Sequence, residues 1–256
     1  MKNIKDSRIW IIGASSGIGR ALAKELAARG AIIVLSARDS VALIDLKAEL
    51  GVQHAVFPLD VTDDESVADV AETVTDSGRI DSVIFMAGQY KPGAVAEMDL
   101  DTAHMIVEVN LNGALNVVNA ILPRMIEQKA GQIALCGSVA GYCGLPRGQP
   151  YSATKAALIN FAESLRTEVA GSGIDVKIIN PGFVHTPMTD QNDFKMPMVI
   201  ETDEAARAIA DGLTRSAFEI HFPKRFTFLM KVLRLLPAAL YFPLAARMDQ
   251  PVKKLN

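Results

Sequence analysis

A tyrosine and a lysine stand four residues apart in the stretch "YSATK", at Tyr151 and Lys155. On a helix the two side chains would lie on one face, about 5–6 Å apart, with only small residues between them. An ammonium group near a phenol favours the phenolate and lowers a pKa that is about 10 in the free side chain. The pair predicts a proton donor and acceptor tuned toward neutral pH, although an isolated pair with this spacing also fits a surface lysine beside a half-buried tyrosine.

A glycine cluster stands much earlier in the chain, in "IIGASSGIGRALA". Gly13, Gly17 and Gly19 follow a strand-like apolar run and precede a helical stretch, with one spacing changed from the G-x-G-x-x-G dinucleotide fingerprint. Glycines at such a turn let the backbone approach a pyrophosphate, and the helix N-terminus beyond them favours an anion. This segment predicts a dinucleotide site.

The end of the second strand-like run, "VLSARD", indicates which dinucleotide is preferred. NAD-binding sites of this kind usually carry an acid there, which bonds the ribose hydroxyl. Here Ser36 is interpreted as replacing the acid, and Arg38 follows two residues later. A guanidinium can bind a 2′-phosphate that a carboxylate would repel, so NADP(H) is favoured over NAD(H). The direction in which the Asp39 side chain points is left open.

Short apolar runs alternate with helical stretches along most of the chain. The runs are "RIWIIGA", "AIIVLSA", "HAVFPLDV", "DSVIFMAG", "GQIALCGS", "IDVKIINPG" and "FEIHF". Helices are expected near 17–30, 40–50, 63–76, 102–129, 151–170 and 202–215. Apolar strands separated by helices indicate an α/β fold, a Rossmann-like doubly wound parallel sheet of about seven strands.

Composition narrows the function classes. The 256 residues are 50% hydrophobic with a formal net charge of −3, which argues against a general nucleic-acid binder. Cys136 and Cys143 are the only cysteines, too few for a disulfide framework, and are interpreted as reduced thiols. The four histidines lack ligand spacing, so no metal is expected. No signal peptide is expected ahead of the first strand, and a cytoplasmic location follows, with the inner membrane surface as an alternative.

Together these motifs resemble the short-chain dehydrogenases/reductases. Their marks occur in order over roughly residues 8 to 220: "GASSGIG", "LDV", "MAG", "VNLNG", "CGSVAG", "YSATK" and "NPGFVHTP". The resemblance implies a Rossmann-like enzyme that assembles as a homodimer or homotetramer through two long helices. It also implies hydride transfer between NADP(H) and a carbonyl or secondary alcohol of a small molecule.

Carried over by position, the resemblance makes Tyr151 the general acid in reduction and the base in oxidation. Lys155 resembles the residue that lowers the tyrosine pKa, and Ser138 the group that holds the substrate oxygen. Asn110 is similar to a residue that anchors a water in a proton relay. The cofactor-binding residues implied are Gly13, Ser15, Ser16, Gly17, Ile18, Gly19, Arg38, Asp60, Val61, Ala87, Gly88, Asn110, Tyr151, Lys155, Pro181, Gly182, Val184 and Thr186.

Two features bear on the substrate. The family pattern "NNAG" is "FMAG" here, so Phe85 and Met86 replace polar side chains thought to brace the sheet beside the cofactor. The segment "DQNDFKMPM" resembles a mobile substrate lid. Apolar residues in and near it indicate an apolar pocket: Phe194, Met196, Met198, Cys143 and Leu145. His185 is expected to face solvent or the lid.

The organisation predicted is a catalytic domain over 1–222 and an apolar, basic helical extension over 223–256, either part of the same domain or peripheral. Residues 221–256 hold seven Lys or Arg and one acid, which leaves a net charge of −9 for the rest. A helix over 226–236 would place Thr227, Lys231 and Arg234 in one polar stripe and apolar residues elsewhere. That apolar face is expected either to pack on the protein or to lie in a membrane interface.

Two other functions fit the same fold: a noncatalytic dinucleotide sensor and a membrane-associated scaffold. The Asn110, Ser138, Tyr151 and Lys155 set favours the enzyme, since a sensor needs no proton donor. The identity of the substrate and the direction of the reaction are left open.

Overall fold

A sheet of seven parallel strands forms the centre of the computed structural model, which describes residues 3–248. The strands are β1 (Arg8–Ile12), β2 (Ile32–Ser36), β3 (Ala55–Val56), β4 (Ser82–Phe85), β5 (Gly131–Cys136), β6 (Ile174–Pro181) and β7 (Glu219–Phe222). Their order across the sheet is β3-β2-β1-β4-β5-β6-β7. The predicted doubly wound sheet is confirmed.

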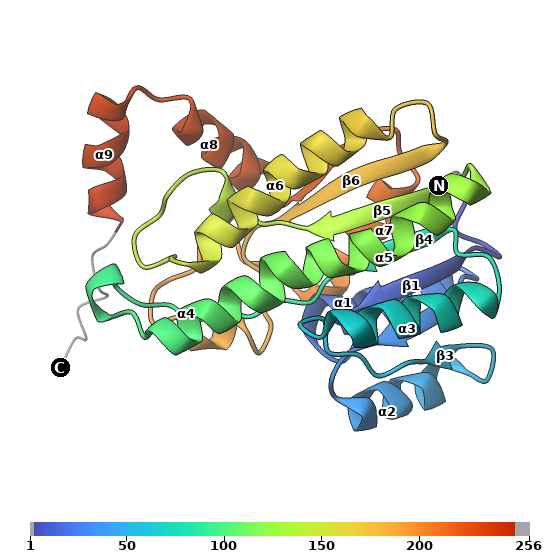
Figure 1. Cartoon of the computed structure of the whole chain (residues 1–256). Helices are drawn as coiled ribbons and strands as arrows, with labels where there is room; N and C mark the ends of the chain where they lie inside the picture. Colours follow the sequence, from blue (N-terminus) through green and yellow to red (C-terminus); the bar gives the residue numbers. More distant parts are fainter. Residues whose placement is uncertain (1–2, 249–256) are drawn as a thin grey trace.

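Helices cover both faces of the sheet (Figure 1). The helices are α1 (Gly17–Ala28), α2 (Ser40–Leu50), α3 (Asp64–Asp76), α4 (Leu100–Val107), α5 (Gly113–Gln128), α6 (Tyr151–Glu168) and α7 (Thr202–Leu213). One apolar core joins α3, α5 and α6 to the sheet, and a second joins α1, α2 and α7 to its other face. Strand β1 serves both cores, because Trp10 and Ile12 face the first while Ile9 and Ile11 face the second.

The position of the site follows from the strand order. Successive crossovers run outward from β1 to β3 in one direction and from β4 to β7 in the other. Between β1 and β4 the connections therefore leave the sheet toward opposite sides, and a crevice opens at the carboxyl ends of these strands. Both the glycine turn after β1 and the "MAG" segment after β4 lie there.

The helical stretch expected over 102–129 is interrupted. A π-helical turn over Glu108–Asn112 separates α4 from α5, and it carries Asn110. The run Leu100–Gln128 is long and apolar enough to cross a membrane by length and composition alone. Its inner face, with Val117 and Ile121, is buried in the first core, so this run is accounted for as a core helix.

The C-terminal extension forms α8 (Lys224–Arg234) and α9 (Ala238–Arg247), with Pro237 as the N-cap of α9. The single helix expected to continue to Leu236 therefore ends two residues earlier. Phe226 and Met230 pack into the first core. Thr227 of the expected polar stripe is fully buried, so part of that stripe faces the protein and not solvent. Lys253 and Lys254 of the basic tail lie outside the described residues.

Candidate active site

A cleft of about 360 Å³ opens at the crossover point, within the size range of small-molecule and cofactor sites. The structure brings together at this cleft nearly all of the predicted cofactor residues, together with Ser138. Those that line it are Gly13, Ser15, Ser16, Gly17, Ile18, Gly19, Arg38, Asp60, Val61, Ala87, Gly88, Tyr151, Lys155, Pro181, Gly182, Val184 and Thr186. Asn110 is the exception and is fully buried behind the lining.

The glycine turn requires glycine at defined positions. Gly13 has φ +93°, and a Cβ there would come within 2.5 Å of the Ala87 backbone nitrogen. A Cβ on Gly19 would collide with the carbonyl oxygen of Gly13, so helix α1 can approach β1 this closely only without a side chain. Ser16, the N-cap of α1, makes no side-chain cap, and the first turn holds no acid. The N-terminus of α1 therefore suits a phosphate, and the residues present fit a dinucleotide.

The end of β2 corrects one prediction. Ser36 is fully buried and its hydroxyl accepts a hydrogen bond of 2.9 Å from the Trp10 indole nitrogen, so it does not occupy the place of the ribose-binding acid. Ala37 lines the cleft instead, followed by Arg38. The Asp39 carboxylate caps α2 by accepting from the Ala42 amide at 2.9 Å, which settles its orientation.

The proton-transfer candidates converge at one end of the cleft. Tyr151 and Lys155 begin α6, and the Lys155 ammonium lies 5.4 Å from the centre of the Tyr151 ring. The same ammonium donates a hydrogen bond of 2.7 Å to the Cys136 carbonyl at the end of β5. Ser138 follows that strand, where its hydroxyl accepts from the Ala140 amide at 3.1 Å and also hydrogen-bonds to Tyr151. A phenol, a hydroxyl and an ammonium thus meet at one corner.

The predicted lowering of the tyrosine pKa is wrong for this structure. Burial raises the pKa of Tyr151, with further contributions in the same direction from Cys136 and Tyr90, and the Ser138 hydrogen bond acts the other way. Burial also lowers the pKa of Lys155. Desolvation disfavours the charged form of both groups and is the largest cause of both shifts.

Asn110 joins three segments behind the cleft. Its Oδ1 accepts a hydrogen bond of 2.6 Å from the Gln89 amide, and its Nδ2 donates to the Gln89 carbonyl at 3.0 Å and the Thr154 hydroxyl at 3.1 Å. It therefore fixes the loop after β4 against α6. A Cβ on Gly88 would lie 3.4 Å from Asn110 Oδ1 and 3.7 Å from Lys155 Nζ, so both groups flank Gly88. Asn110 therefore lies behind the cleft lining, beside Gly88, and its role in cofactor binding and in a proton relay stays a prediction.

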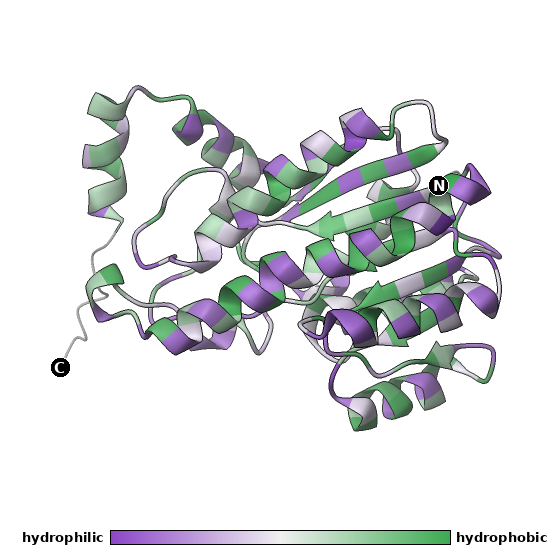
Figure 2. Cartoon of the chain, viewed as in Figure 1, coloured by the Kyte–Doolittle hydropathy of each residue, from purple (hydrophilic) through white to green (hydrophobic). Residues whose placement is uncertain are grey.

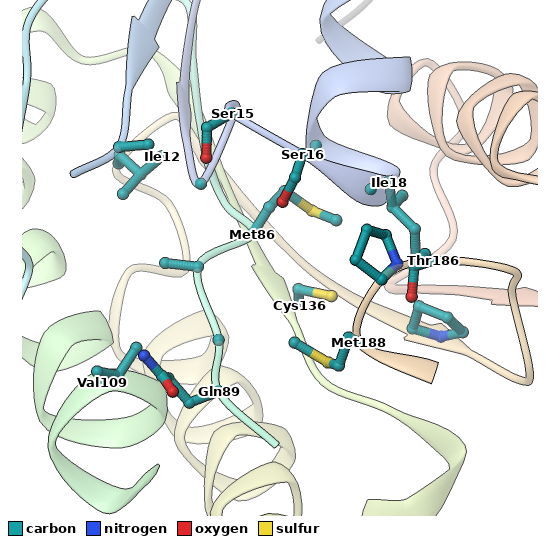
Figure 3. Close-up of a pocket in the computed structure, with 18 of the residues that line it drawn as sticks. Ile12, Ser15, Ser16, Ile18, Met86, Gln89, Val109, Cys136, Thr186 and Met188 are labelled. Atoms are coloured by element: carbon teal, nitrogen blue, oxygen red, sulfur yellow. The ribbon is translucent and has the colours of Figure 1, made fainter. Parts of the chain in front are cut away.

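The segment after β6 forms the opposite wall. The Thr189 hydroxyl donates to the Val184 carbonyl at 2.7 Å and accepts from the Thr186 amide at 3.0 Å, which holds 184–189 in a compact turn. Figure 3 shows the side chains of Met86 and Cys136, together with Met188 of this segment, among the residues that line the middle of the cleft. His185 is half exposed and lies 3.8 Å from Glu201, outside the lining, as expected.

The two apolar residues of "FMAG", Phe85 and Met86, are accommodated by packing against the cores. Phe85 is fully buried in the first core, and Met86 lines the cleft while packing against the second core. Polar bracing at these two positions is therefore replaced by van der Waals contact. The Met86 amide still donates to the Ile12 carbonyl at 2.7 Å, so β1 and the segment after β4 stay joined.

Sequence reasoning missed the residues that connect the site to the segment 190–198. Tyr90 packs edge-on against Tyr151, with ring centres 5.0 Å apart, and its hydroxyl donates to the Asn192 side chain at 2.8 Å. Arg147 pairs with Asp193 at 3.0 Å. Gln89 and Met188 also line the cleft. The sequence signal for Gln89 and Met188 was their position alone, because Gln89 directly follows "MAG" and Met188 directly follows "NPGFVHTP".

The apolar residues expected to form the pocket lie elsewhere. Phe194 packs against Phe183, with ring centres 5.8 Å apart, and Met198 is about half exposed. Cys143 and Leu145 pack against the first core. Met196 accepts from Asn192. The cleft instead takes its apolar wall from Val109, Cys136 and Met188, among others.

Comparison with known proteins identifies the family. The pattern of the family described as short chain dehydrogenase matches residues 7–196. The chain belongs to the short-chain dehydrogenases. It is therefore an oxidoreductase of a family that uses NAD(P)(H) and acts on small-molecule carbonyls and alcohols.

Individual relatives cover most of this short-chain dehydrogenase. An uncharacterized oxidoreductase of Myxococcus xanthus is 34% identical over 242 residues, which are 93% of this chain and 96% of that protein. One from Staphylococcus epidermidis is 35% identical over 216 residues, 84% of this chain and 94% of that protein. A 3-oxoacyl-[acyl-carrier-protein] reductase of Escherichia coli is 36% identical over 188 residues, 73% and 77% of the two chains.

Solved structures agree in fold and carry either dinucleotide. A short-chain dehydrogenase from Burkholderia cenocepacia in complex with NADP superposes with a TM-score of 0.83 and 27% identity, covering 97% of this chain and 100% of that one. One from Burkholderia phymatum in complex with NAD has a TM-score of 0.84 and covers both chains fully. At 21% identity the second comparison concerns the fold alone.

Proposed function

We propose that this short-chain dehydrogenase is an NADP(H)-dependent reductase of apolar ketones or aldehydes in which Tyr151 transfers the proton. The observation that supports it best is the convergence of Ser138, Tyr151 and Lys155 at one corner of a cleft that fits a dinucleotide. The reverse oxidation of a secondary alcohol uses the same groups.

Each side chain has a defined task in this proposal. When bound, the nicotinamide supplies or accepts hydride. Charge then develops on the substrate oxygen, and the Tyr151 hydroxyl gives its proton to that oxygen while the Ser138 hydroxyl orients it. Because burial raises the pKa of Tyr151, the phenol is protonated at neutral pH, which suits the donor in the direction of reduction. Lys155 is held by the Cys136 carbonyl so that its ammonium flanks Gly88 and the tyrosine ring.

The preference for NADP(H) rests on the end of β2. Ala37 brings no charge to the cleft lining, and the Asp39 carboxylate is engaged as the cap of α2. The Arg38 side chain is exposed beside the cleft, and within residues 3–248 its guanidinium takes part in no hydrogen bond or ion pair. A free guanidinium at this point suits a 2′-phosphate.

The proposed substrate class rests on the end of the cleft that holds Ser138 and Tyr151. Cys136, Met188 and Val109 contribute apolar side chains to the cleft lining. Apolar side chains close to the polar corner of Ser138 and Tyr151 suit a carbonyl carried on an apolar skeleton.

The test is NADPH oxidation followed at 340 nm against acyl, steroid, retinoid and small aromatic carbonyls. We expect turnover of at least one apolar class, with NADPH giving a higher kcat/KM than NADH. Tight NADPH binding without turnover across all four classes would favour a noncatalytic dinucleotide sensor. The dinucleotide's own binding, measured by fluorescence, separates that outcome from a misfolded sample.

A further inference from the structure

An apolar surface lies on the two C-terminal helices, whose residues do not line the dinucleotide cleft. Large apolar side chains are exposed on both helices: Phe228, Leu229, Val232 and Leu235 on or just after α8, and Leu240, Phe242, Leu244 and Met248 on or just after α9. Phe228 is 68% exposed and Leu235 81% exposed. In Figure 2 helix α9 is mostly green, the colour of apolar residues, although it lies at the outside of the molecule. We call these eight residues the α8–α9 patch.

The exposure of α8 follows from how the helix is attached. On its inner side the Thr227 hydroxyl hydrogen-bonds to His221 Nδ1 at 2.6 Å, and the Lys231 ammonium donates to the Glu219 carboxylate. Glu219 also accepts from Tyr142 and from Asn180 Nδ2, at 2.8 Å from the latter. These polar contacts, together with the buried Phe226 and Met230, hold one side of α8 on the protein, so Phe228, Leu229, Val232 and Leu235 are left on the exposed side. Isolated surface apolar residues are ordinary, whereas eight large apolar side chains exposed on two consecutive helices indicate an interaction surface.

The charges around the α8–α9 patch favour an anionic partner. Lys224, Arg225, Arg234 and Arg247 are exposed on the same two helices, and residues 223–248 contain no Asp or Glu. A second copy joined by a twofold axis would set these four cations against themselves, since such an interface pairs a surface with itself. An anionic lipid surface offers an apolar layer beneath negative headgroups, which matches both parts of the patch.

We propose that the α8–α9 patch docks the protein on the surface of an anionic lipid bilayer, with its apolar side chains in the interface and its cations against the headgroups. Both helices are too short to span a membrane, at 11 and 10 residues, so the contact is peripheral. The rest of the chain, with its net negative charge, is repelled by the same headgroups, which favours one orientation.

The docked orientation brings the membrane close to the active site. The Tyr241 hydroxyl of α9 donates to the Gly144 carbonyl, in the loop between β5 and α6 that begins with Ser138. On the other side, Phe226 of α8 packs against Phe183, with ring centres 5.4 Å apart, and Phe183 directly precedes the compact turn 184–189. Figure 1 shows α8 and α9 beside this loop, at the end of the molecule away from α2.

Co-sedimentation with vesicles tests the docking without any need for catalysis. The full chain is mixed with phosphatidylcholine vesicles, with or without phosphatidylglycerol, at about 25 mM and about 500 mM salt. We expect binding to the phosphatidylglycerol vesicles at low salt that weakens at high salt. The pair Arg225→Gln and Arg234→Gln should lower the partition coefficient about 25-fold, roughly fivefold for each charge. The pair Phe228→Asp and Leu235→Asp should abolish binding.

Matched variants make the result specific to this surface. Val41→Asp with Val52→Asp removes apolar residues that are 68% and 95% exposed near α2, and Arg124→Gln with Arg207→Gln removes two cations elsewhere; both should bind as the wild type does. NADP(H) binding shows that each variant is folded. The proposal is overturned if the wild type stays in the supernatant at low salt, or if the control pairs lose binding equally. It is also overturned if sedimentation velocity shows an oligomer that only Phe228→Asp with Leu235→Asp dissociates, since the patch then joins two copies.

Discussion

The dinucleotide cleft and the α8–α9 patch place apolar and polar groups in opposite ways. At the cleft, glycines expose backbone, and the reactive side chains are held inside by short hydrogen bonds, such as that from Lys155 to the Cys136 carbonyl at 2.7 Å. At the patch, polar contacts such as Lys231 with Glu219 lie inside, and Phe228 and Leu235 lie outside. Catalysis requires a few reactive atoms held in fixed positions away from water, whereas docking to a surface requires a large area of exposed apolar side chains. The two regions should therefore respond to different substitutions.

The largest expected effect is the loss of turnover when the proton-donating hydroxyl is removed. Tyr151→Phe removes the hydroxyl that meets the substrate oxygen, so turnover should fall about 10²-fold or more with little change in NADP(H) binding. Tyr241→Phe is the matched hydroxyl deletion on α9. The Tyr241 hydroxyl bonds to the Gly144 carbonyl and to Cys143, neither of which lines the cleft, so turnover of this variant should stay within about threefold of the wild type. Steady-state kinetics checks both, and near-normal turnover in Tyr151→Phe would remove the proposed role.

The next effect concerns the choice of cofactor. Arg38→Ala should narrow the gap between the NADPH and NADH dissociation constants by about 1.5–3 kcal/mol, because a charge-assisted contact to the 2′-phosphate is lost. Ala37→Asp is the reciprocal change, since it places a carboxylate in the cleft lining. It should weaken the binding of NADPH and leave the binding of NADH unchanged. Fluorescence titration measures both constants. Equal affinity of the wild type for the two dinucleotides would contradict the preference.

What the sequence could predict depended on local backbone requirements. The positions of Gly13 and Gly19 follow from a turn that admits no side chain, and the alternation of apolar runs with helices was enough to predict a sheet of seven parallel strands. Ser36 was misplaced because a shift of one residue along a strand turns a side chain to the other face. The motif showed where β2 ends but not which of its last residues faces the cleft.

Other features depended on contacts between distant segments. Burial beside Tyr90 and Cys136 decides the direction in which the pKa of Tyr151 moves, and the spacing of Tyr151 and Lys155 gives no sign of it. Similarly, the helical periodicity of α8 identified a polar stripe without showing which way it faces. That orientation is set by Glu219 and His221 on β7, which accept or share its hydrogen bonds.

A smaller effect tests the glycine turn as a purely steric requirement. Gly19→Ala should lower the free energy of unfolding by about 1–3 kcal/mol and weaken dinucleotide binding, because its Cβ would displace the Gly13 carbonyl. Gly93→Ala is the control, as nothing lies within 4 Å of a Cβ there. Urea unfolding with cofactor titration compares them. Similar stabilities for the two variants would mean that the turn can relax.

The smallest effect concerns the clamp that turns α8 outward. Burial alone would raise the pKa of Glu219, but hydrogen bonds from Lys231, Tyr142 and Asn180 outweigh it, and the net shift lowers the pKa below its ordinary value. A carboxylate whose pKa is lower in the folded state contributes stability above its ordinary pKa of about 4.3 and loses that contribution as pH falls through the folded value. Glu219→Gln keeps the shape and removes the charge.

The clamp should therefore show a specific dependence on pH. Between about pH 7 and pH 5, the free energy of unfolding from urea titration should be about 1 kcal/mol lower for Glu219→Gln than for the wild type. The effect is small because Lys231 and Glu219 are both partly exposed. As the pH falls below the ordinary pKa of about 4.3 toward the lower pKa of the folded state, the wild-type carboxyl becomes protonated and resembles the glutamine, so the difference should shrink. NADP(H) affinity should not change, since the residues that line the cleft do not include Glu219. A difference that stays constant as the pH falls would show that the Glu219 charge does not hold α8 in place, and would leave the Thr227–His221 hydrogen bond and the packing of Phe226 and Met230 to attach the helix.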